Sequence, residues 1–258
     1  MVTAEPGLPR VALVTGGSRG IGAAIAVGLA QAGHPVAVNY VRDRDAAVDV
    51  VTTIEAIGGP AVAVQGDVGV RAEAERIVDE VASVLGPIAC LVNNAGVHLG
   101  APVVKLAPDA WDESIRVNLS GAFYVTQQCL PSMYEARWGR VVFIGSAASQ
   151  VPFPGDAAYA ATKAGLEGMA GCLAREVGGH GITVNTVVPG WVETDMTKAI
   201  APHVRERLLR STPVITGSEV ADLVCYLCGD AARSITGERI WVRGAKEPDA
   251  PRGGHSKS

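Results

Sequence analysis

Short apolar runs alternate along this chain with longer stretches that mix polar and apolar residues. Seven runs are almost continuously apolar and rich in β-branched residues, at positions 10–15, 35–40, 60–66, 88–94, 140–145, 182–189 and 238–243. Such runs are typical of parallel strands that are covered on both faces. The segments between the first six runs are long enough for crossover helices. The pattern therefore predicts an α/β fold: a doubly wound, mostly parallel seven-stranded sheet with helices on both faces.

The chain has no internal repeat and no linker before residue 244. Its 258 residues suit a single α/β domain, and an apolar content of 48% supports a large core. Thr216 and Glu219 have the spacing of a capping box, which predicts a helix that begins near Gly217. Residues 244–258 are rich in glycine, proline and charge. We expect one domain over residues 1–243 and a flexible C-terminal tail over residues 244–258, with docking at a subunit contact as the tail's alternative role.

Charge and hydropathy exclude several classes of protein. A net charge of −4 gives no basic surface for nucleic acid. The first ten residues lack the apolar core of a signal peptide, and the longest uncharged stretch, residues 81–104, contains prolines, asparagines and a histidine. We therefore expect a cytoplasmic protein that binds neither nucleic acid nor a membrane.

The five cysteines include one C-x-x-C pair, Cys225 and Cys228, with no second pair and no histidine at zinc spacing. The pair lies in a helical pattern in which residues three apart share a face. Buried core thiols are the favoured interpretation, and metal or redox chemistry is the alternative. Free thiols suit a reducing compartment, and we expect no metal site.

A glycine-rich turn follows the first apolar run. Gly16, Gly20 and Gly22 have the spacing G-x-x-x-G-x-G, which differs from the G-x-G-x-x-G dinucleotide fingerprint. A turn between a strand and a helix lets backbone N–H groups approach a pyrophosphate, and the helix N-terminus adds a positive dipole end. A plain turn that opens a buried helix is the alternative.

The end of the second run indicates which dinucleotide is bound. NAD sites usually carry an acidic residue there for the ribose 2′-hydroxyl, but this chain has Tyr40 near that position. Arg42 follows, and Arg19 lies in the glycine turn. Two guanidinium groups beside a missing carboxylate suit a 2′-phosphate, although Asp43 and Asp45 come soon after. The pattern favours NADPH over NADH.

The ends of the third and fourth runs carry compatible groups. Asp67, followed by Val68, supplies a carboxylate that accepts a hydrogen bond from an adenine amino group. The small residues of NNAG at 93–96 allow the backbone to approach a ribose. A solvated loop acid and a tight turn are the alternatives for these two features. Because carboxyl ends of parallel strands meet at one edge of a sheet, we expect them to lie beside the glycine turn.

A second set of residues suggests catalysis. Tyr159 and Lys163 are four residues apart in a predicted helix, so they lie on one face. Before desolvation is counted, a lysine ammonium about 5 Å away favours the phenolate by about 3 kcal/mol at an effective dielectric constant of about 20, which predicts a lowered tyrosine pKa. Ser146, just past the fifth run, has a hydroxyl that can hold a carbonyl oxygen. Asn118 lies in a helical stretch whose interior does not favour asparagine. A chance surface pair is the alternative for Tyr159 and Lys163.

Six features occur in the order and spacing found in short-chain dehydrogenases/reductases: TGGSRGIG, NNAG, Asn118, Ser146, YAATK and PGWVETDM. The chain resembles that family over residues 8–243. The resemblance implies a Rossmann-like fold in which Tyr159 protonates a carbonyl oxygen as hydride arrives from the nicotinamide. It further implies that Lys163 lowers the pKa of the tyrosine and binds the nicotinamide ribose. Ser146 then polarises the carbonyl, and Asn118 holds a water that links Lys163 to a proton relay.

The resemblance extends the cofactor site to residues 189–194, which pack on the nicotinamide in this family, and its arginine at position 19 agrees with NADPH. Together with the residue patterns it predicts these cofactor contacts: Gly16, Ser18, Arg19, Gly20, Ile21, Gly22, Tyr40, Arg42, Asp67, Val68, Asn94, Ala95, Gly96, Tyr159, Lys163, Pro189, Gly190, Val192 and Thr194.

Within the family the chain looks most like the 3-oxoacyl-[acyl-carrier-protein] reductases. That likeness implies a 3-oxoacyl thioester substrate, bound to acyl carrier protein or CoA, in fatty-acid or polyketide-type synthesis. It also implies a homotetramer or homodimer, and a docking role for Arg137 and Arg175 with the acidic carrier protein. Surface solvation is the alternative for these arginines. The last run ends in VRGA where the family has V-D-G-G. This departure leaves as the alternative a short-chain alcohol dehydrogenase or carbonyl reductase that acts on a small free ketone or a secondary metabolite.

Two other classes of function are disfavoured. A non-catalytic nucleotide sensor or scaffold would lack members of the tetrad formed by Asn118, Ser146, Tyr159 and Lys163, and all four are present. A serine hydrolase would place its nucleophile in a G-x-S-x-G elbow, which does not surround Ser146.

Overall fold

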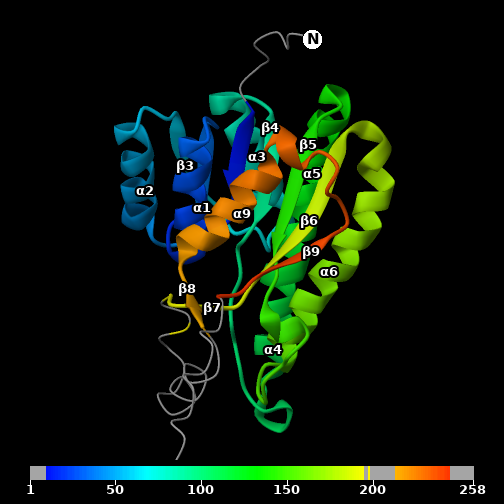
Figure 1. Ribbon diagram of the computed structural model, residues 1–258. Coiled ribbons are helices and arrows are strands. Elements are labelled where there is room, and N and C mark those ends of the chain that lie inside the picture. The colour runs from blue at the N-terminus through cyan, green and yellow to red at the C-terminus, as the bar shows by residue number, and fades with distance from the viewer. Residues whose placement is uncertain (1–9, 195–196, 198–212, 245–258) are drawn as a thin grey trace, which may run out of the picture.

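A seven-stranded sheet forms the centre of the computed structural model, which describes residues 10–194, 197 and 213–244 (Figure 1). The strand order is β3-β2-β1-β4-β5-β6-β9, and every neighbouring pair is parallel. The fold is therefore the predicted α/β, Rossmann-like one, with a sheet that is wholly rather than mostly parallel. The strands are β1 (Val11–Val14), β2 (Val36–Tyr40), β3 (Ala61–Gln65), β4 (Ile88–Asn93), β5 (Gly139–Ile144), β6 (Ile182–Pro189) and β9 (Arg239–Val242).

Helices cover both faces of the sheet. One core cluster joins the sheet to α1 (Gly20–Gln31), α2 (Arg44–Ala56) and α9 (Gly217–Cys228). A second cluster joins the opposite face to α3 (Arg71–Leu85), α5 (Gly121–Ala136) and α6 (Ala157–Val177). Figure 1 shows α1 and α9 crossing in front of the strands. Burial on both faces explains why the strands are apolar at successive positions rather than at alternate ones.

Shorter elements lie near the carboxyl ends of the strands. They are the 3-10 turns η1 (Val103–Lys105) and η3 (Ala147–Ser149), the helix α4 (Pro108–Ile115), and a two-stranded parallel sheet of β7 (Trp191–Val192) and β8 (Val214–Ile215). The apolar pattern did not predict this small sheet, because two-residue strands carry no periodic signal. The predicted capping box is confirmed: the Thr216 side chain accepts from the Glu219 backbone, and α9 begins at Gly217.

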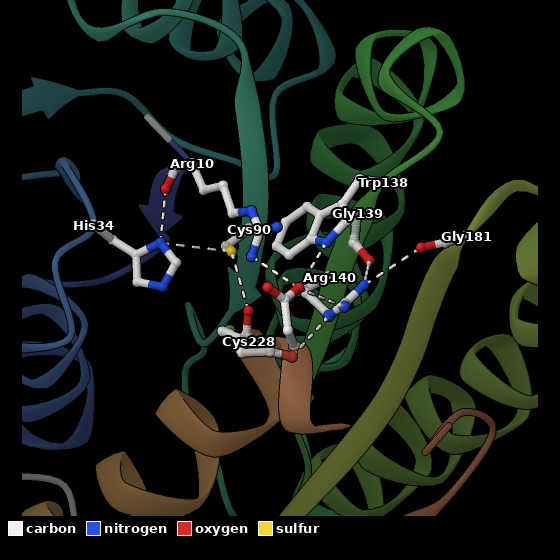
Figure 2. A network of polar contacts seen from close by, with 10 residues as sticks. Arg10, His34, Cys90, Trp138, Gly139, Arg140, Gly181 and Cys228 are labelled. Carbon is white, nitrogen blue, oxygen red and sulfur yellow. Dashed lines mark hydrogen bonds and ion pairs between the residues drawn. The ribbon is translucent and has the colours of Figure 1, made fainter. Parts of the chain in front are cut away.

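A polar network closes the opposite end of the sheet, where the strands begin (Figure 2). Arg140 in β5 is 2% exposed, and its guanidinium donates to the backbone oxygens of Gly139, Gly181 and Gly229. It also lies 4.2 Å from the centroid of the Trp138 ring. Burial lowers the pKa of Arg140. This buried arginine thus binds backbone oxygens at the start of β5, just before β6 and at the end of α9.

Other contacts in the network fix the start of β1. Arg10 stacks 4.0 Å from the centroid of Trp138 and pairs with Asp230 at 2.8 Å. Its backbone oxygen lies 2.7 Å from Nδ1 of His34. The network thereby joins β1, β5 and the turn after α9, which the chain order separates widely.

The thiols lie as the core interpretation requires. Cys228 is fully buried, and Cys225 packs against the same cluster. Burial raises the pKa of the Cys225 thiol to about 12, so it is protonated at neutral pH. Among the residues described, no group of three or more histidine, cysteine and acidic side chains is placed to hold a metal ion. None of the helices in that part of the chain has the length and hydropathy needed to cross a bilayer.

Candidate active site

The glycine turn after β1 leaves the N-terminus of α1 open. Gly16 and Gly20 have φ values of +60° and +55°, which L side chains rarely adopt. A side chain at Gly22 would collide with the backbone oxygen of Gly16. Arg19 is the N-cap residue, yet its side chain does not cap the helix. The first N–H groups of α1 are therefore available to a phosphate, which fits the predicted pyrophosphate cradle.

Thr15 and Asn94 hold this turn against the end of β4. The backbone N–H groups of Asn94 and Ala95 both donate to Thr15 Oγ1 at 3.0 Å. The Asn94 amide donates to the backbone oxygens of Thr15 at 2.9 Å and Gly16 at 3.0 Å. The side chain of Asn94 thus holds the backbone of the glycine turn in place, and both of its amide N–H groups are already bound in doing so. Thr15 opens the TGGSRGIG motif, but the sequence pattern gave it no role.

The region predicted for the 2′-phosphate combines Arg19, Asp43 and Arg42 at the surface. Arg19 pairs with Asp43 at 2.9 Å, and Asp43 also caps α2 by accepting from the backbone N–H of Ala46. Arg42 is exposed and makes no ion pair with another described residue. Tyr40 is 5% exposed and packs in the core, so its phenol is not at the surface beside the arginines. The predicted contact at Tyr40 is limited to its backbone.

Asp67 lies at the end of β3, as predicted, but its carboxylate already has partners. Oδ2 lies 2.9 Å from Arg116, and Oδ1 accepts from the backbone N–H of Gly69. Arg116 also binds Glu113, and these two carboxylates raise its pKa. Val68 is 2% exposed and packs against Gly121, so only its backbone faces the cofactor region. A carboxylate has further lone pairs, so Asp67 can still accept from an adenine amino group.

Asn118 lies in a short π-helix, Arg116–Ser120, between α4 and α5. It is 1% exposed, and its amide exchanges two hydrogen bonds with the backbone of Val97, at 2.7 and 2.9 Å. It also donates to Thr162 Oγ1 at 3.2 Å. A π-turn widens the helix, which accommodates an asparagine that the ordinary helix interior disfavours. Asn118 therefore joins the loop after β4 to α6.

The two catalytic candidates of α6 lie together. Lys163 is 3% exposed, and its Nζ lies 5.5 Å from the centroid of the Tyr159 ring. Nζ donates to the backbone oxygen of Ile144 at 2.7 Å. A side chain at Gly96 would lie 3.4 Å from Asn118 Oδ1 and 3.8 Å from Lys163 Nζ. The tight approach of the NNAG segment thus brings the cofactor region and the catalytic candidates into contact.

The predicted lowering of the Tyr159 pKa is wrong. Burial of the phenol raises its pKa, a hydrogen bond from Ser146 opposes the rise, and the charge of Asp156 adds to it. Burial likewise lowers the pKa of Lys163 to about 8. The expectation counted the lysine charge and left out desolvation, which acts against both ionised forms. At neutral pH the arrangement is a neutral phenol beside a lysine that is still mostly protonated.

Ser146 begins the turn η3 after β5, and its Oγ accepts from the backbone N–H of Ala148 at 3.2 Å. Its hydroxyl also reaches the Tyr159 phenol. Glu167 in α6 secures this turn, because it accepts from Ser149, Gln150 and Arg239. Glu167 was not singled out by any motif, since its partners come from two segments far from each other in the sequence, the turn at Ser149 and Gln150 and the start of β9.

Four side chains thus converge beside an open phosphate-binding turn: a serine and a tyrosine in mutual reach, a buried lysine, and a buried asparagine. Residues 10–205 match the short chain dehydrogenase family, which is more than two thirds of the chain. The chain belongs to the short-chain dehydrogenase family.

Characterised relatives within this family cover almost the whole chain. The 3-oxoacyl-[acyl-carrier-protein] reductase FabG of Staphylococcus aureus is 39% identical over 240 residues, which are 92% of this chain and 98% of the relative. The acetoacetyl-CoA reductase of Shinella zoogloeoides is 40% identical over 243 residues, 93% of this chain and 99% of the relative. A blue fluorescent protein from a metagenomic library, solved in complex with NADPH, has a TM-score of 0.86 at 36% identity and covers 91% of this chain and 96% of that chain.

The segment that this dehydrogenase is expected to pack on the nicotinamide follows β6. Gly190 donates to the backbone oxygen of Val242 at 2.8 Å, Val192 is 5% exposed, and a side chain at Gly20 would lie 3.4 Å from Thr194. Residues 189–194 therefore lie beside the glycine turn, as a cofactor contact requires. The rest of PGWVETDM, residues 195 and 196, lies outside the described residues.

The predicted docking arginines lie far from these catalytic candidates. Arg175 is in the last turn of α6, and Arg137 ends α5 with a φ of +50°. Arg137 donates to the backbone oxygen of Gly179 at 3.1 Å, which places both arginines near one end of α6. Tyr159 is near the other end, and a rise of about 1.5 Å per residue separates it from Arg175 by roughly 24 Å.

Proposed function

We propose that this short-chain dehydrogenase reduces a ketone to a secondary alcohol with NADPH, and that its substrate is a 3-oxoacyl thioester bound to CoA or acyl carrier protein. The proposal is carried by the position of Lys163, whose Nζ lies 5.5 Å from the centroid of the Tyr159 ring, with Ser146 on the turn that faces the same phenol. Relatives named for 3-oxoacyl-[acyl-carrier-protein] and acetoacetyl-CoA reduction support the substrate class. A small free ketone is the alternative substrate.

The cofactor residues fit NADPH. The uncapped N-terminus of α1 receives the pyrophosphate, and Arg19 and Arg42 flank the position of the 2′-phosphate. Gly96 and the segment 189–194 approach the nicotinamide half. The solved relative that holds NADPH supports the same choice. Bound NADPH supplies the hydride.

The chain's own side chains manage the carbonyl and the proton. Ser146 donates a hydrogen bond to the carbonyl oxygen and polarises it. Tyr159 stays a neutral phenol, because burial raises its pKa, and it gives its proton to the oxygen that becomes the alcohol. Lys163, with a pKa of about 8, is mostly charged at neutral pH and stabilises the phenolate that remains. Asn118 holds the adjoining loop and the helix in register.

Two loops with exposed apolar side chains border this site, which suits an acyl chain. The loop after β4 carries Val103 and Val104, which are 73% and 90% exposed. The loop before α6 carries Val151, which is 63% exposed. The loops touch, since a side chain at Gly155 would lie 3.7 Å from the backbone of Ala101. Exposed apolar side chains on loops beside a site favour a substrate with a hydrocarbon tail.

The length of α6 links two proposals: that a carrier protein docks on Arg137 and Arg175, and that the chain forms a homodimer or homotetramer. A carrier protein on Arg137 and Arg175 sits roughly 24 Å from Tyr159 of the same chain. The outer face of α6 carries small exposed residues, among them Ala161, Ala164 and Gly168. Nothing described lies within 4 Å of a side chain built at Gly168. A second copy packed antiparallel on this face brings the arginines of one protomer toward the tyrosine of the other, which supports a homodimer or homotetramer.

The purified chain, assayed for NADPH oxidation with acetoacetyl-CoA, an acetoacetyl carrier protein and a panel of free ketones, tests the proposal. We expect turnover of both thioesters, with kcat/KM at least about tenfold above that for any free ketone. If only the free ketones are turned over, the thioester proposal is wrong and a small free ketone is the substrate. No oxidation of NADPH with any ketone overturns the reductase proposal.

A further inference from the structure

His98 and Asp156 form a side-chain hydrogen bond beside the catalytic candidates, and none of the matched motifs includes either residue. His98 Nε2 lies 2.9 Å from Asp156 Oδ1, and the side chains are 24% and 19% exposed. His98 follows the NNAG segment after β4, and Asp156 precedes α6. The pair therefore bridges the two loops whose contact closes over the start of α6.

Asp156 is not used as its local sequence suggests. It occupies the N-cap position of α6, where an aspartate ordinarily accepts from the first N–H groups of the helix. Here the side chain makes no capping hydrogen bond, and the carboxylate turns to His98. The position therefore keeps a carboxylate that serves a tertiary contact in place of the local cap.

His98 also touches the catalytic candidate itself. Its ring centroid lies 5.0 Å from that of Tyr159, with an interplanar angle of 84°. Such an edge-to-face contact orients an aromatic ring. A side chain at Gly100 would lie 3.1 Å from His98 Cε1, so the glycine leaves the space that the imidazole occupies. The imidazole is thus held from one side by a carboxylate and packs on the phenol with its other side.

We propose that His98, held by Asp156, is a positioning residue for Tyr159: it fixes the phenol ring and offsets the negative charge of Asp156, so that the phenol can release its proton. The inference rests on the proposed function, since it assigns a control to the proton donor of that reaction.

The charges around the phenol give the pair its effect. Lys163 and Asp156 approach Tyr159 from α6 and its N-cap, His98 approaches from the loop after β4, and the uncharged Ser146 approaches from the turn after β5. The charge of Asp156 raises the pKa of Tyr159. A donor on that carboxylate weakens its field at the phenol. Removing His98 should therefore raise the pKa of the Tyr159 phenol, and removing the charge of Asp156 should lower it.

Titration of Tyr159 by the ultraviolet absorbance of tyrosinate, taken as the difference between each protein and the same protein with Tyr159→Phe, tests this directly. In His98→Phe, which keeps an aromatic edge, the Asp156 charge is unopposed, and we expect the Tyr159 pKa to rise by about 0.5 to 1 unit. In Asp156→Asn the charge is gone, and we expect a fall of about the same size. His98→Gln keeps a neutral donor and serves if the phenylalanine variant does not fold; we expect a smaller rise.

A second histidine provides a matched control. His180 packs on Tyr134 with centroids 4.5 Å apart and an interplanar angle of 85°, beyond the far end of α6. His180→Phe should leave the Tyr159 titration unchanged. Shifts of the same sign in His98→Phe and Asp156→Asn, or no shift in either folded variant, would overturn the inference.

The reaction rate supplies the second readout. Reduction needs the protonated phenol, so the alkaline fall of kcat/KM should move up in pH in His98→Phe and down in Asp156→Asn. The titration needs no substrate, and so it tests the pair even if the reductase proposal fails. If the wild-type protein reduces the substrate but the Tyr159 pKa is the same in His98→Phe and Asp156→Asn, the reductase proposal holds and only the role of His98 is wrong.

Discussion

The Arg19 guanidinium lies 2.9 Å from the carboxylate of Asp43, at the edge of the glycine turn. The same carboxylate caps α2, which holds Arg19 at the position where a 2′-phosphate is expected. Asp43, which weighs against NADPH in the sequence, thus also orders the arginine that favours it.

Arg19→Ala should weaken NADPH binding about 10- to 100-fold and NADH binding little, since a charge-assisted hydrogen bond contributes about 1.5 to 3 kcal/mol. Fluorescence titration with both cofactors measures the two affinities. Arg233→Ala, at an exposed arginine near the other end of the sheet, is the control and should change neither. Equal weakening of both cofactors would remove Arg19 from the 2′-phosphate site.

Tyr159→Phe should lower kcat by about 100- to 10,000-fold, because it removes the proton donor while keeping the ring. NADPH affinity should stay within about twofold, since the phenol oxygen adds little to the binding of the ground state. Steady-state kinetics and a cofactor titration on one preparation separate these effects. If the Tyr159→Phe variant keeps its turnover, Tyr159 is not the proton donor and another group must be.

Asn118→Ala should lose both stability and turnover. The variant leaves the backbone N–H and oxygen of Val97 without their side-chain partner and removes one hydrogen bond of Thr162, at a cost of about 1 to 3 kcal/mol. Asn185 is also 1% exposed and binds the backbone of Ile235 and Glu238 away from the site. Asn185→Ala should lose similar stability in urea and keep its kcat. A similar loss of kcat in both variants would make Asn118 a structural residue only.

Arg140→Met should reduce the free energy of unfolding by about 2 to 4 kcal/mol, because it removes a buried guanidinium that donates to the backbone oxygens of Gly139, Gly181 and Gly229. Arg10→Met removes a partly exposed ion pair from the same Trp138 stack and should lose less than about 1 kcal/mol. Urea denaturation followed by circular dichroism measures both. Turnover of the folded fraction should be unchanged, since the network of Figure 2 lies where the strands begin, away from the site.

Arg175→Glu should raise the KM for an acetoacetyl carrier protein about tenfold and leave that for acetoacetyl-CoA unchanged, since only the former carries an acidic surface. Arg71→Glu, at an exposed arginine of α3, makes the same charge change elsewhere. Equal effects of the two variants on the carrier protein would reduce the role of Arg175 to net charge. Sedimentation of the wild-type chain tests the assembly that this docking requires.

The sequence alone was sufficient for the class of fold and for the family. Continuous apolar runs report burial on both faces of a strand, and the spacing of glycine, serine, tyrosine and lysine reports which strand ends meet. These signals come from residues close together in the sequence, so they can be interpreted without knowing how the chain packs. The sequence also predicted the capping box of α9, because that contact joins residues three apart.

Contacts between distant segments needed the tertiary structure. Asp156 resembles a helix cap and pairs with His98 instead, Asp67 is bound by Arg116, and Tyr40 points into the core. The pKa of Tyr159 had the wrong predicted direction, because desolvation depends on everything packed around the phenol and a spacing of four residues records only the lysine. The sequence by itself thus determined which strand ends and functional groups form the site. The tertiary structure decided which of these groups are buried, and with that their protonation and their hydrogen-bond partners.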